Sequence, residues 1–422
     1  MNFEMNKGEL KREIYFDRDE RWWNCESNRL AIESSKAALP TFVIVKDETL
    51  REGLTVPGRN RLSLEELVEI GEGLEDAGFR EIEVGYTAAV DEHRHFAISL
   101  KKRSKLRQSA HTRTWASDWK TEIDGVLDAG ADIVNLAGFG TSETEKFTQP
   151  NHRKDALPDL FAEQIAYSKS KGAFTSFHIS ANVTRPDIME RCYRLAAEAG
   201  ADRTNVGDGY GVSTPEGTRY LISRVKEIVG PKVEVGLHAH NDFGLGTANG
   251  LAAVTAGATM VDASINSLGD RAGITNSVTL VAALEALYGV ETGIKLDRLK
   301  ALSETVARKW GIDITPHEPV IGKNMYRHET DLHIAALLSG NWFAYNVIRP
   351  DVLGEKTLLQ FGPASLAKGQ MSSVGVKIRK MGKSATEAQV DVVLAKMRGK
   401  LERASSGFIS EDELEDIISE VI

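Results

Sequence analysis

Short hydrophobic runs alternate with longer amphipathic segments through most of this chain. Four times, an alanine-rich or acidic helical segment runs into a glycine and then into a strand-like run, at Gly78, Gly130, Gly200 and Gly257. Glycine is the residue that most easily adopts the left-handed conformation at a helix C-terminus. The pattern therefore predicts a repeated unit of helix, glycine and strand.

The spacing of these glycines predicts the number of strands. Successive glycines lie 52, 70 and 57 residues apart, whereas one strand–helix unit needs about 30 residues. Each interval therefore holds two units, and the further hydrophobic runs lie near residues 108–112, 175–179 and 233–237. With the run at 42–45, the chain has eight strands, which predicts an α/β fold of the (β/α)8 TIM-barrel type.

Two helix starts support this register. Ser63 and Glu66 have the spacing of a capping box, and Thr214 precedes Pro215 at a predicted first helical position. The strand–helix rhythm then stops near residue 315. We therefore expect three parts: an N-terminal extension (1–40), a TIM-barrel catalytic domain (41–315), and small α-helical or mixed C-terminal subdomains (316–422) that contribute to the active site.

The two outer parts contain less regular signals. Capping-box patterns at Ser384 to Glu387 and at Ser410 to Glu413 predict helices near the C-terminus. The pair Trp22-Trp23 in the N-terminal extension is expected to pack on the barrel or on a partner subunit.

Two polar motifs close the first and the seventh predicted strands. They are Asp47-Glu48-Thr49-Leu50-Arg51-Glu52-Gly53 and His238-Ala239-His240-Asn241-Asp242. Chemistry in a TIM barrel lies where the strands end, and strand 8 stands between strands 7 and 1, so the two motifs are expected to meet. Residues i and i+2 of a strand point the same way, so His238 and His240 face one point.

These side chains suggest a metal site. Two imidazoles and one carboxylate are a common protein share of an open divalent-metal site, and Glu52 is the best third ligand. For an isolated His–x–His pair, two structural histidines are an equal alternative, but the polar residues around both motifs favour the metal. Arg51 must pair with an acid or serve an anionic intermediate, because burying an unpaired guanidinium is costly.

Composition excludes several other classes of protein. The balance of 52 basic against 61 acidic residues, a net charge of −9, argues against a general nucleic-acid binder. With only Cys25 and Cys192, neither a disulfide framework nor a cysteine-rich zinc site is expected. No apolar stretch approaches the roughly 20 residues of a membrane helix. We expect a soluble cytoplasmic protein that binds no membrane.

Several segments together resemble one enzyme superfamily. The two motifs above, with Gly269-Asp270-Arg271-Ala272-Gly273, are similar to those of the DRE-TIM metallolyases, and above all to the Claisen-condensing homocitrate, isopropylmalate and citramalate synthases. Further agreement lies at Ile82-Glu83-Val84-Gly85, Gly140-Thr141-Ser142, Gly207-Asp208 and Asn249. The resemblance covers roughly residues 41–365.

This resemblance implies a function and a set of site residues. It implies an acyltransferase that condenses acetyl-CoA, or a related acyl-CoA, with a 2-oxo acid to give a 2-hydroxy acid and CoA. Glu52, His238 and His240 would hold a divalent cation (Mg, Mn or Zn), and Arg51 would stabilise the oxyanion that develops on the carbonyl. The substrate-binding residues that it implies are Asp47, Glu83, Thr141, Arg185, Asp208 and Asn241.

The region after the barrel adds a further match. His328 to His333 resembles the family's His–x–x–Gly–Ile–His segment, with Asp331 where glycine is usual. Tyr345 precedes Pro350-Asp351 as a tyrosine does in the condensing enzymes. By resemblance, His333 and Tyr345 are expected to perform acid–base work on the acyl-CoA side, and the protein is expected to be a homodimer.

Departures from the family leave alternatives open. Ala181-Asn182 replaces a Glu–Asp pair after strand 5, Gly209 replaces a threonine after strand 6, and Leu54-Thr55 stands where the family has a glutamine after the first motif. The oxo acid is therefore not fixed. A carbon–carbon lyase like hydroxymethylglutaryl-CoA lyase is the main alternative, although Asp270-Arg271 replaces its loop cysteine. A non-catalytic regulatory barrel is the second alternative.

Overall fold

The computed structural model describes residues 14–34, 39–138, 157–403 and 406–422. Among these residues the chain forms two compact units. One contains residues 31–314, and the other combines residues 14–30 with residues 315–422. Each unit is described by itself below.

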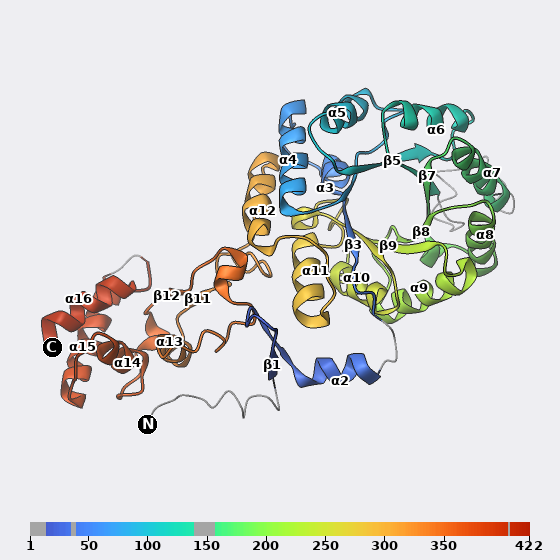
Figure 1. The fold of residues 1–422 in the computed structure, drawn as a ribbon. Helices are drawn as coiled ribbons and strands as arrows, with labels where there is room; N and C mark the ends of the chain where they lie inside the picture. The colour runs from blue at the N-terminus through green and yellow to red at the C-terminus, as the bar shows by residue number, and fades with distance from the viewer. Residues whose placement is uncertain (1–13, 35–38, 139–156, 404–405) are drawn as a thin grey trace. The chain divides into compact units, whose positions relative to one another are not determined.

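The larger unit is a closed barrel of eight parallel strands, as the sequence predicted (Figure 1). The first strand pairs with the last, Met260 lying opposite Ile44 and Ala263 opposite Asp47. The other pairs join neighbours in the chain, so each strand is followed by a right-handed crossover to the next. The strands are β3 (Ile44–Asp47), β4 (Glu81–Glu83), β5 (Arg107–Arg113), β6 (Ile133–Gly138), β7 (Phe174–Ile179), β8 (Arg203–Asp208), β9 (Glu234–Ala239) and β10 (Met260–Ala263).

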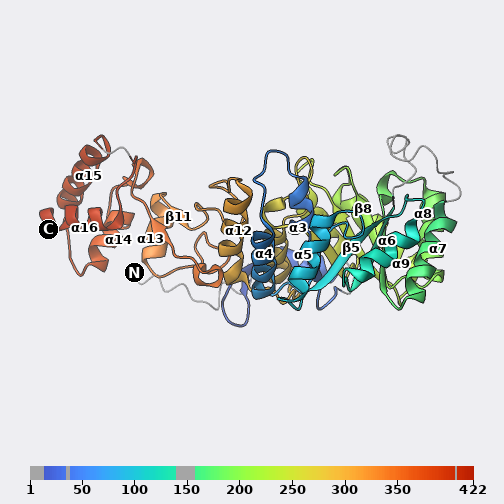
Figure 2. The same ribbon diagram turned by 90° about the horizontal axis from the view of Figure 1, so that it is seen from above.

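Helices surround this ring of strands, and Figure 2 shows α4, α5 and α6 along one flank of the barrel. Their buried residues recur at helical spacing, as Leu67, Leu74 and Ala77 do in α4. The helices are α3 (Thr49–Glu52), α4 (Leu64–Ala77), α5 (Asp91–Lys101), α6 (Trp119–Asp128), α7 (Leu157–Ser170), α8 (Pro186–Glu198), α9 (Pro215–Val229), α10 (Gly246–Thr255), α11 (Ser277–Ala283) and α12 (Leu296–Trp310). The unit also contains the short 3-10 helices η1 (Gly53–Thr55), η4 (Ala181–Val183) and η5 (Ile265–Ser267) and the π-helix η6 (Leu284–Tyr288).

The local signals read from the sequence are confirmed in this unit. Ser63 and Glu66 form the capping box of α4, and the Thr214 hydroxyl accepts a hydrogen bond from the Gly217 amide at the start of α9. All four repeat glycines have positive φ. At Gly78 a side chain is also excluded by space, because a Cβ atom would lie 2.5 Å from the Gly293 carbonyl oxygen.

The second unit has short strands and a small helical core. Its elements are β1 (Ile14–Phe16), β2 (Trp23–Cys25), β11 (Arg327–His328), α13 (Asp331–Leu338), η7 (Pro350–Leu353), β12 (Leu358–Leu359), η8 (Pro363–Ser365), α14 (Ser373–Lys380), α15 (Glu387–Leu401) and α16 (Glu411–Val421). Helix α2 (Glu26–Ser34) follows β2. The core gathers buried side chains of α13 to α16 with Phe361, including Val393 and Leu414.

Two predictions for this unit need comment. The capping box at Ser410 and Glu413 is confirmed, but the one at Ser384 and Glu387 is wrong. Thr386 caps α15 instead, because its hydroxyl accepts from the Gln389 amide while the Gln389 side chain returns to the Thr386 amide. Both residues of each pair have the required types, so the sequence alone did not separate the two registers.

The tryptophan pair contacts the C-terminal part of the chain. The indole N–H of Trp23 donates to the Asn346 carbonyl oxygen at 2.7 Å, and the backbone amide of Trp23 donates to the Val347 carbonyl oxygen at 3.1 Å. Trp22 is buried and forms a β-bridge with Ile348. These contacts explain why residues 14–30 fold with residues 315–422.

The interior of the barrel is polar along its axis. The Lys46 ammonium on β3 lies 2.8 Å from Glu48 Oε1, 3.2 Å from Glu83 Oε2 and 3.2 Å from Asp262 Oδ1, and all four side chains are buried. Deeper in the barrel, Arg203 pairs with Glu81. An ionic interior is costly in free energy unless every charge is matched. These buried charged residues therefore indicate a functional role in addition to packing.

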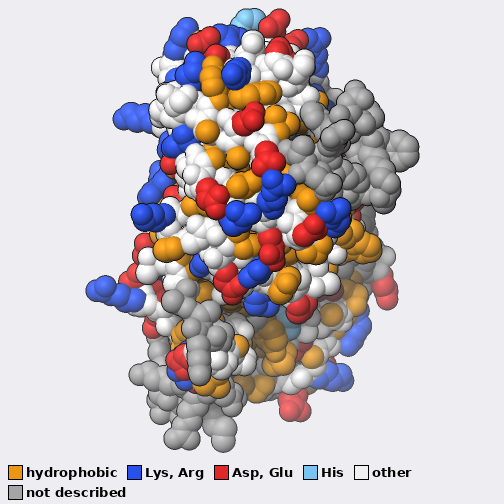
Figure 3. Space-filling model, turned by 90° about the vertical axis from the view of Figure 1, so that its right-hand side faces the viewer, with side chains coloured by type: hydrophobic (Ala, Val, Ile, Leu, Met, Phe, Trp, Pro, Cys, Tyr) orange, Lys and Arg blue, Asp and Glu red, His pale blue; other side chains and the backbone are white. Residues whose placement is uncertain are grey.

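The outer face has a different character. On the side drawn in Figure 3, basic and acidic side chains are interspersed instead of forming a basic stripe. On the outer helices, Arg191 of α8 pairs with Asp159 of α7, and Arg224 of α9 pairs with Glu190 of α8. Among the described residues, no helix is long and apolar enough to span a membrane.

The buried ammonium leads to a stability prediction. Replacing Lys46 with methionine keeps the length of the side chain but leaves three buried carboxylates without their shared cation. We expect Lys46→Met to lower the free energy of unfolding by about 3–5 kcal/mol, measured by urea denaturation. The exposed control Lys232→Met should change it by less than about 0.5 kcal/mol. Equal stability of the two variants would show that the interior tolerates the unpaired acids.

Candidate metal centre and active site

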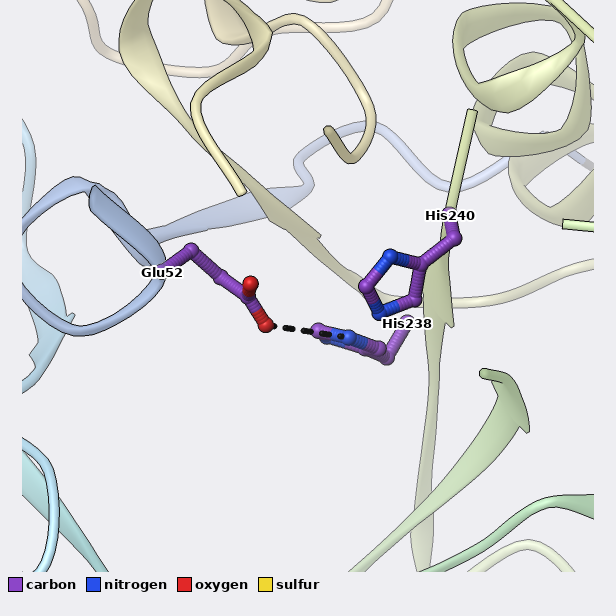
Figure 4. Close-up of side chains that lie close together, drawn as sticks. All are labelled: Glu52, His238 and His240. Carbon is purple, nitrogen blue, oxygen red and sulfur yellow. Dashed lines mark ion pairs between the residues drawn. The ribbon is translucent and has the colours of Figure 1, made fainter. Parts of the chain in front are cut away.

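Three buried ligand groups meet where β3 and β9 end. Glu52 lies in α3, directly after β3, while His238 and His240 extend from the end of β9 (Figure 4). One ligand atom from each residue lies within 4.8 Å of the others, and His238 Nε2 is 3.7 Å from Glu52 Oε1. Ligands bound to one zinc ion at about 2.1 Å are themselves about 3 to 3.5 Å apart. The groups therefore stand close to the spacing that a shared cation requires.

A second carboxylate orients one of the two imidazoles. His238 Nδ1 lies 3.2 Å from Asp262 Oδ2 on the neighbouring strand β10. In neutral His238 this contact places the proton on Nδ1, which leaves the Nε2 lone pair facing Glu52. A carboxylate behind a histidine in this way is a common support for a metal ligand.

The protonation states also suit a cation. Burial, with the neighbouring His238, lowers the pKa of His240 to about 4, so this imidazole is neutral at neutral pH. Burial opposes ionisation of Glu52, but the charges of Arg51 and the two histidines lower its net pKa. Burial also opposes charge on His238, and the Asp262 hydrogen bond and charge outweigh it and raise the pKa of this imidazole. The raised pKa of His238 therefore makes a proton compete with a bound cation more strongly at His238 than at His240.

Two further observations test the fit of a divalent ion. Among the described residues, His240 Nδ1 is buried and has no hydrogen-bond partner, which is unusual for a structural histidine. The connected cluster also holds four carboxylates against two permanent cations, leaving two negative charges when its histidines are neutral. The acids are Glu48, Glu52, Glu83 and Asp262, and the cations are Lys46 and Arg51. A divalent ion balances this cluster.

A second group of three ligands, Glu48, His238 and Asp262, is equally compact. The Lys46 ammonium contacts both of its carboxylates, at 2.8 and 3.2 Å. A permanent cation therefore already neutralises this group, and Glu52, His238 and His240 remain the better candidate for a metal.

Arg51 lies at the edge of this cluster. Its Nε donates to Glu48 Oε2 at 3.0 Å and its Nη1 lies 2.6 Å from Glu52 Oε1, so two acids hold the guanidinium. Arg51 also lines a cavity of about 520 Å³ together with Tyr86 and His93. A fixed positive charge thus borders both the candidate metal ligands and a space large enough for a small organic acid.

Two of the expected substrate-binding residues have internal partners. Asp47 is buried and accepts hydrogen bonds from the Thr49 amide and hydroxyl, both at 2.9 Å, while that hydroxyl accepts from the Ile265 amide at 2.8 Å. Burial raises the pKa of Asp47 to about 7. Glu83 contacts Lys46 and accepts from Ser109 at 2.8 Å. Both residues shape the mouth of the barrel from within.

The remaining expected residues lie in several places. Asp208 accepts from the Asn182 side chain at 2.6 Å and from the Ser213 amide at 2.9 Å, and Asn241 accepts from the Gly246 amide at 2.9 Å, so both organise loops at the mouth. Arg185 pairs with Asp187 at the exposed start of α8, and the structure does not bring it to the metal ligands. Thr141 lies outside the described residues.

His333 and Tyr345 lie together in the second unit. Their rings stack with centroids 3.4 Å apart and an interplanar angle of 16°. Tyr345 is half exposed and has a φ of +68°, which is uncommon for a residue with a side chain. Backbone strain of this kind often occurs at functional sites. Burial lowers the pKa of His333.

The sequence interpretation missed several polar groups inside the barrel. His111 lies 2.9 Å from Glu83, and His178 stands beside His238 with ring centroids 5.4 Å apart. Lys46 and Asp262 were missed as well. For His111, His178 and Asp262 the available signal was strand alternation, because each occupies an inward position of a predicted strand. Lys46 follows directly after the first predicted strand (42–45).

Comparison with known proteins gives an independent result. The HMGL-like family model matches residues 43–306. The chain is 30% identical over 391 residues to homocitrate synthase AksA of Methanopyrus kandleri, covering 91% of this chain and 94% of that protein. It is 30% identical over 389 residues to 2-isopropylmalate synthase of Methanocaldococcus jannaschii, covering 91% and 72%. The HMG-CoA lyase structure from Bacillus subtilis superposes with a TM-score of 0.56 at 19% identity, over 65% of this chain and 96% of that one, which shows the shared fold alone.

The ligand cluster leads to a prediction about metal binding. His238→Ala, His240→Ala and Glu52→Gln each remove one ligand, so each is expected to weaken Mn²⁺ or Co²⁺ binding at least about 10-fold, measured by calorimetry on the purified chain. His95→Ala, an exposed histidine on α5, is the matched control and should bind like the unaltered protein. Unchanged affinity in all three ligand variants would place any metal elsewhere.

Proposed function

The chain belongs to the HMGL-like, or DRE-TIM metallolyase, family, and from this premise we propose that it joins an acyl-CoA, such as acetyl-CoA, to a 2-oxo acid. A carbon–carbon bond forms between the acetyl methyl carbon and C2 of the oxo acid. Water then cleaves the thioester, so that the products are free CoA and a 2-hydroxy acid. This is the reaction type of the alkyl-malate and homocitrate synthases with which the chain shares about 30% identity.

The observation that best supports this proposal is the arrangement of Glu52, His238 and His240 beside the partly buried Arg51. A bound divalent cation would supply Lewis acidity toward the carbonyl and carboxylate oxygens of a 2-oxo acid. The chain supplies two neutralisable imidazoles and a charged carboxylate at one point. The contact with Asp262 holds the His238 ring in one orientation, which would keep its Nε2 lone pair directed at a bound cation.

Arg51 is proposed to stabilise the oxyanion that forms as C2 is attacked. Its guanidinium is held by Glu48 and Glu52, so it need not reorganise when charge develops. The adjoining cavity of about 520 Å³ gives the substrate access to that charge. Arginine, unlike lysine, offers several N–H donors in a fixed plane, and two of its nitrogens can stay engaged with acids while another donates to substrate.

His333 and Tyr345 are proposed to remove and return protons on the acyl-CoA side. Support comes from the family resemblance, from the direct stacking of the two rings and from the strained backbone of Tyr345. On the same resemblance we propose that residues 316–422 contribute to the active site, and that the protein works as a cytoplasmic homodimer. The resemblance also offers Asp47, Glu83, Thr141, Arg185, Asp208 and Asn241 as substrate-binding residues, of which Asp208 and Asn241 act through the loops they hold.

The lyase alternative would use a cysteine in the loop after β10, and the described residues of that loop include none. Cys192 is buried in α8, and burial raises its pKa to about 12. Cys25 belongs to β2 of the other unit. At the position of the expected loop cysteine, Arg271 pairs with Asp242 at 2.8 Å. These observations favour condensation over cleavage. Metal-dependent turnover of any acyl-CoA, once measured, would exclude a purely regulatory barrel.

The reaction leads to a first kinetic prediction. The metal-loaded chain should release CoA from acetyl-CoA only when a 2-oxo acid is present, detected with a thiol reagent. Arg51→Lys should lower kcat by about 10²-fold or more while Mn²⁺ remains bound, because a lysine cannot keep both acid contacts and donate to the oxyanion. The exposed control Arg308→Lys should have unaltered kcat. An Arg51→Lys effect confined to KM would indicate a ground-state contact only.

A second kinetic prediction concerns the other unit. His333→Ala is expected to retain Mn²⁺ and oxo-acid affinity yet to lower CoA release by about 10²-fold or more, as loss of an acid–base group does. Calorimetry measures the first property and thiol release the second. His317→Ala, an exposed histidine of the same unit, is the control. If His333→Ala retains full turnover, this unit provides no proton-transfer group at position 333.

A further inference from the structure

The imidazole of His178 faces the interior of the barrel beside the candidate metal ligands. Its neighbours on β7 point the other way, because the Thr175 hydroxyl lies 2.8 Å from that of Ser168 in α7, and Phe177 packs on Phe161. Strand alternation therefore turns His178 inward. Its ring lies 5.4 Å from that of His238, in an edge-on arrangement at 68°.

Like His240, and unlike His238 and His111, His178 has no hydrogen-bond or ion-pair partner among the described residues. His238 contacts Asp262 and His111 contacts Glu83. Its side chain also keeps partial accessibility, unlike its buried neighbours Phe177 and Ile179. A partly accessible polar group without a partner among the described residues is available to bind a ligand.

The adjacent strand β8 leaves room for this imidazole. A Cβ atom at Gly207 would lie 2.6 Å from His178 Nε2, so only glycine permits the observed ring position. One step further along, Gly209 has no side chain, and a Cβ atom there would lie 3.4 Å from the Ser180 hydroxyl. Ala181 likewise presents only a methyl group. The wall that lacks the family's Glu and Thr side chains thus holds an unpaired imidazole.

His178 stands beside the metal ligands but is not one of them. The compact ligand group contains Glu52, His238 and His240 and does not include His178. If the carboxylate and 2-oxo oxygens of the substrate face that group, the remaining side chain of the substrate must extend along the barrel wall. A neutral imidazole offers that side chain one hydrogen-bond donor and one acceptor.

We propose that His178 is a specificity-determining residue that hydrogen-bonds a hydroxyl or carboxylate group on the side chain of the 2-oxo acid. The protein then takes polar 2-oxo acids in preference to branched alkyl ones, because an alkyl group leaves the imidazole desolvated and unpaired. The inward-facing His111 and Asn135 make the neighbouring wall polar as well. This inference rests on the proposed function, since it assumes a 2-oxo acid as substrate.

The test measures binding without acyl-CoA, so that it is independent of turnover. Calorimetry on the full-length, Mn²⁺-loaded chain compares three ligands: 2-oxoglutarate, 4-hydroxy-2-oxobutanoate and 3-methyl-2-oxobutanoate. The first carries a carboxylate, the second a hydroxyl and the third a branched alkyl group. The unaltered protein should bind at least one polar acid about 10-fold or more tightly than the branched one, and the tighter of the two polar ligands identifies the group recognised.

The variant His178→Leu removes both hydrogen-bonding atoms at similar volume. It should weaken binding of the preferred polar acid about 10-fold or more while binding of the branched acid and of Mn²⁺ changes less than about twofold. His178→Asn keeps a donor and an acceptor, so its affinity for the polar acid should fall less than that of the leucine variant. If the leucine variant does not fold, the ratio of polar to branched affinity in His178→Asn serves as the test. His95→Leu is the matched control on exposed α5.

Three outcomes overturn the proposal. They are equal affinity of the unaltered protein for polar and branched acids, equal weakening of both by the His178 variants, and loss of Mn²⁺ affinity in those variants, which would show that the ring only packs against His238. CoA release is scored separately. If the polar preference depends on His178 but no CoA is released, condensation is contradicted and this inference stands. If CoA is released but the preference does not depend on His178, this inference is contradicted and condensation stands.

Discussion

One buried ammonium holds the interior of this barrel together. Lys46 contacts Glu48, Glu83 and Asp262, and each of these acids supports a different part of the candidate site. Glu48 holds Arg51, Asp262 orients His238, and Glu83 contacts His111. Moving any one of these charges alters the others, because unpaired charges in a low-dielectric interior are costly. The positions of the ligands and of the arginine are therefore fixed together.

This arrangement explains why the barrel has a polar axis and an apolar shell. Side chains between the strands and the helices are apolar, as Phe161, Phe177 and Tyr193 are around β7, and they provide the burial that stabilises the fold. Inward positions instead hold charged and hydrogen-bonding groups. Stability and chemistry are thus assigned to opposite faces of the same strands, which is possible because successive residues of a strand alternate.

The charge of the cluster links its structure to the proposed chemistry. Four acids and two permanent cations leave two negative charges, and the neutral His240 and charged Glu52 stand where a cation would need them. Arg51 adds a positive charge at the edge of the same cluster, next to a cavity. One network can therefore hold a divalent ion, position a substrate oxygen and stabilise a developing oxyanion without large rearrangement. In our proposal, the wall around His178 selects the rest of the substrate.

The amino-acid sequence by itself determined the barrel and brought the candidate metal ligands together. Glycine caps, strand spacing and the two motifs at strand ends are local properties, and the parallel ladder that closes β10 on β3 follows from eight strands and right-handed crossovers. Adjacent placement of the Glu52 and His238 motifs followed from that closure. Their contact needed no knowledge of side-chain packing.

Only the tertiary structure decided which polar groups inside the barrel act together. Lys46, Asp262, His111 and His178 come from four different strands, and nothing in the sequence links any one of them to the others. Their partnership depends on the stagger of the strands around the barrel, which brings distant positions to one level and cannot be read from a single strand. The pairing of residues 14–30 with residues 346–348 is likewise a long-range contact without a local signature.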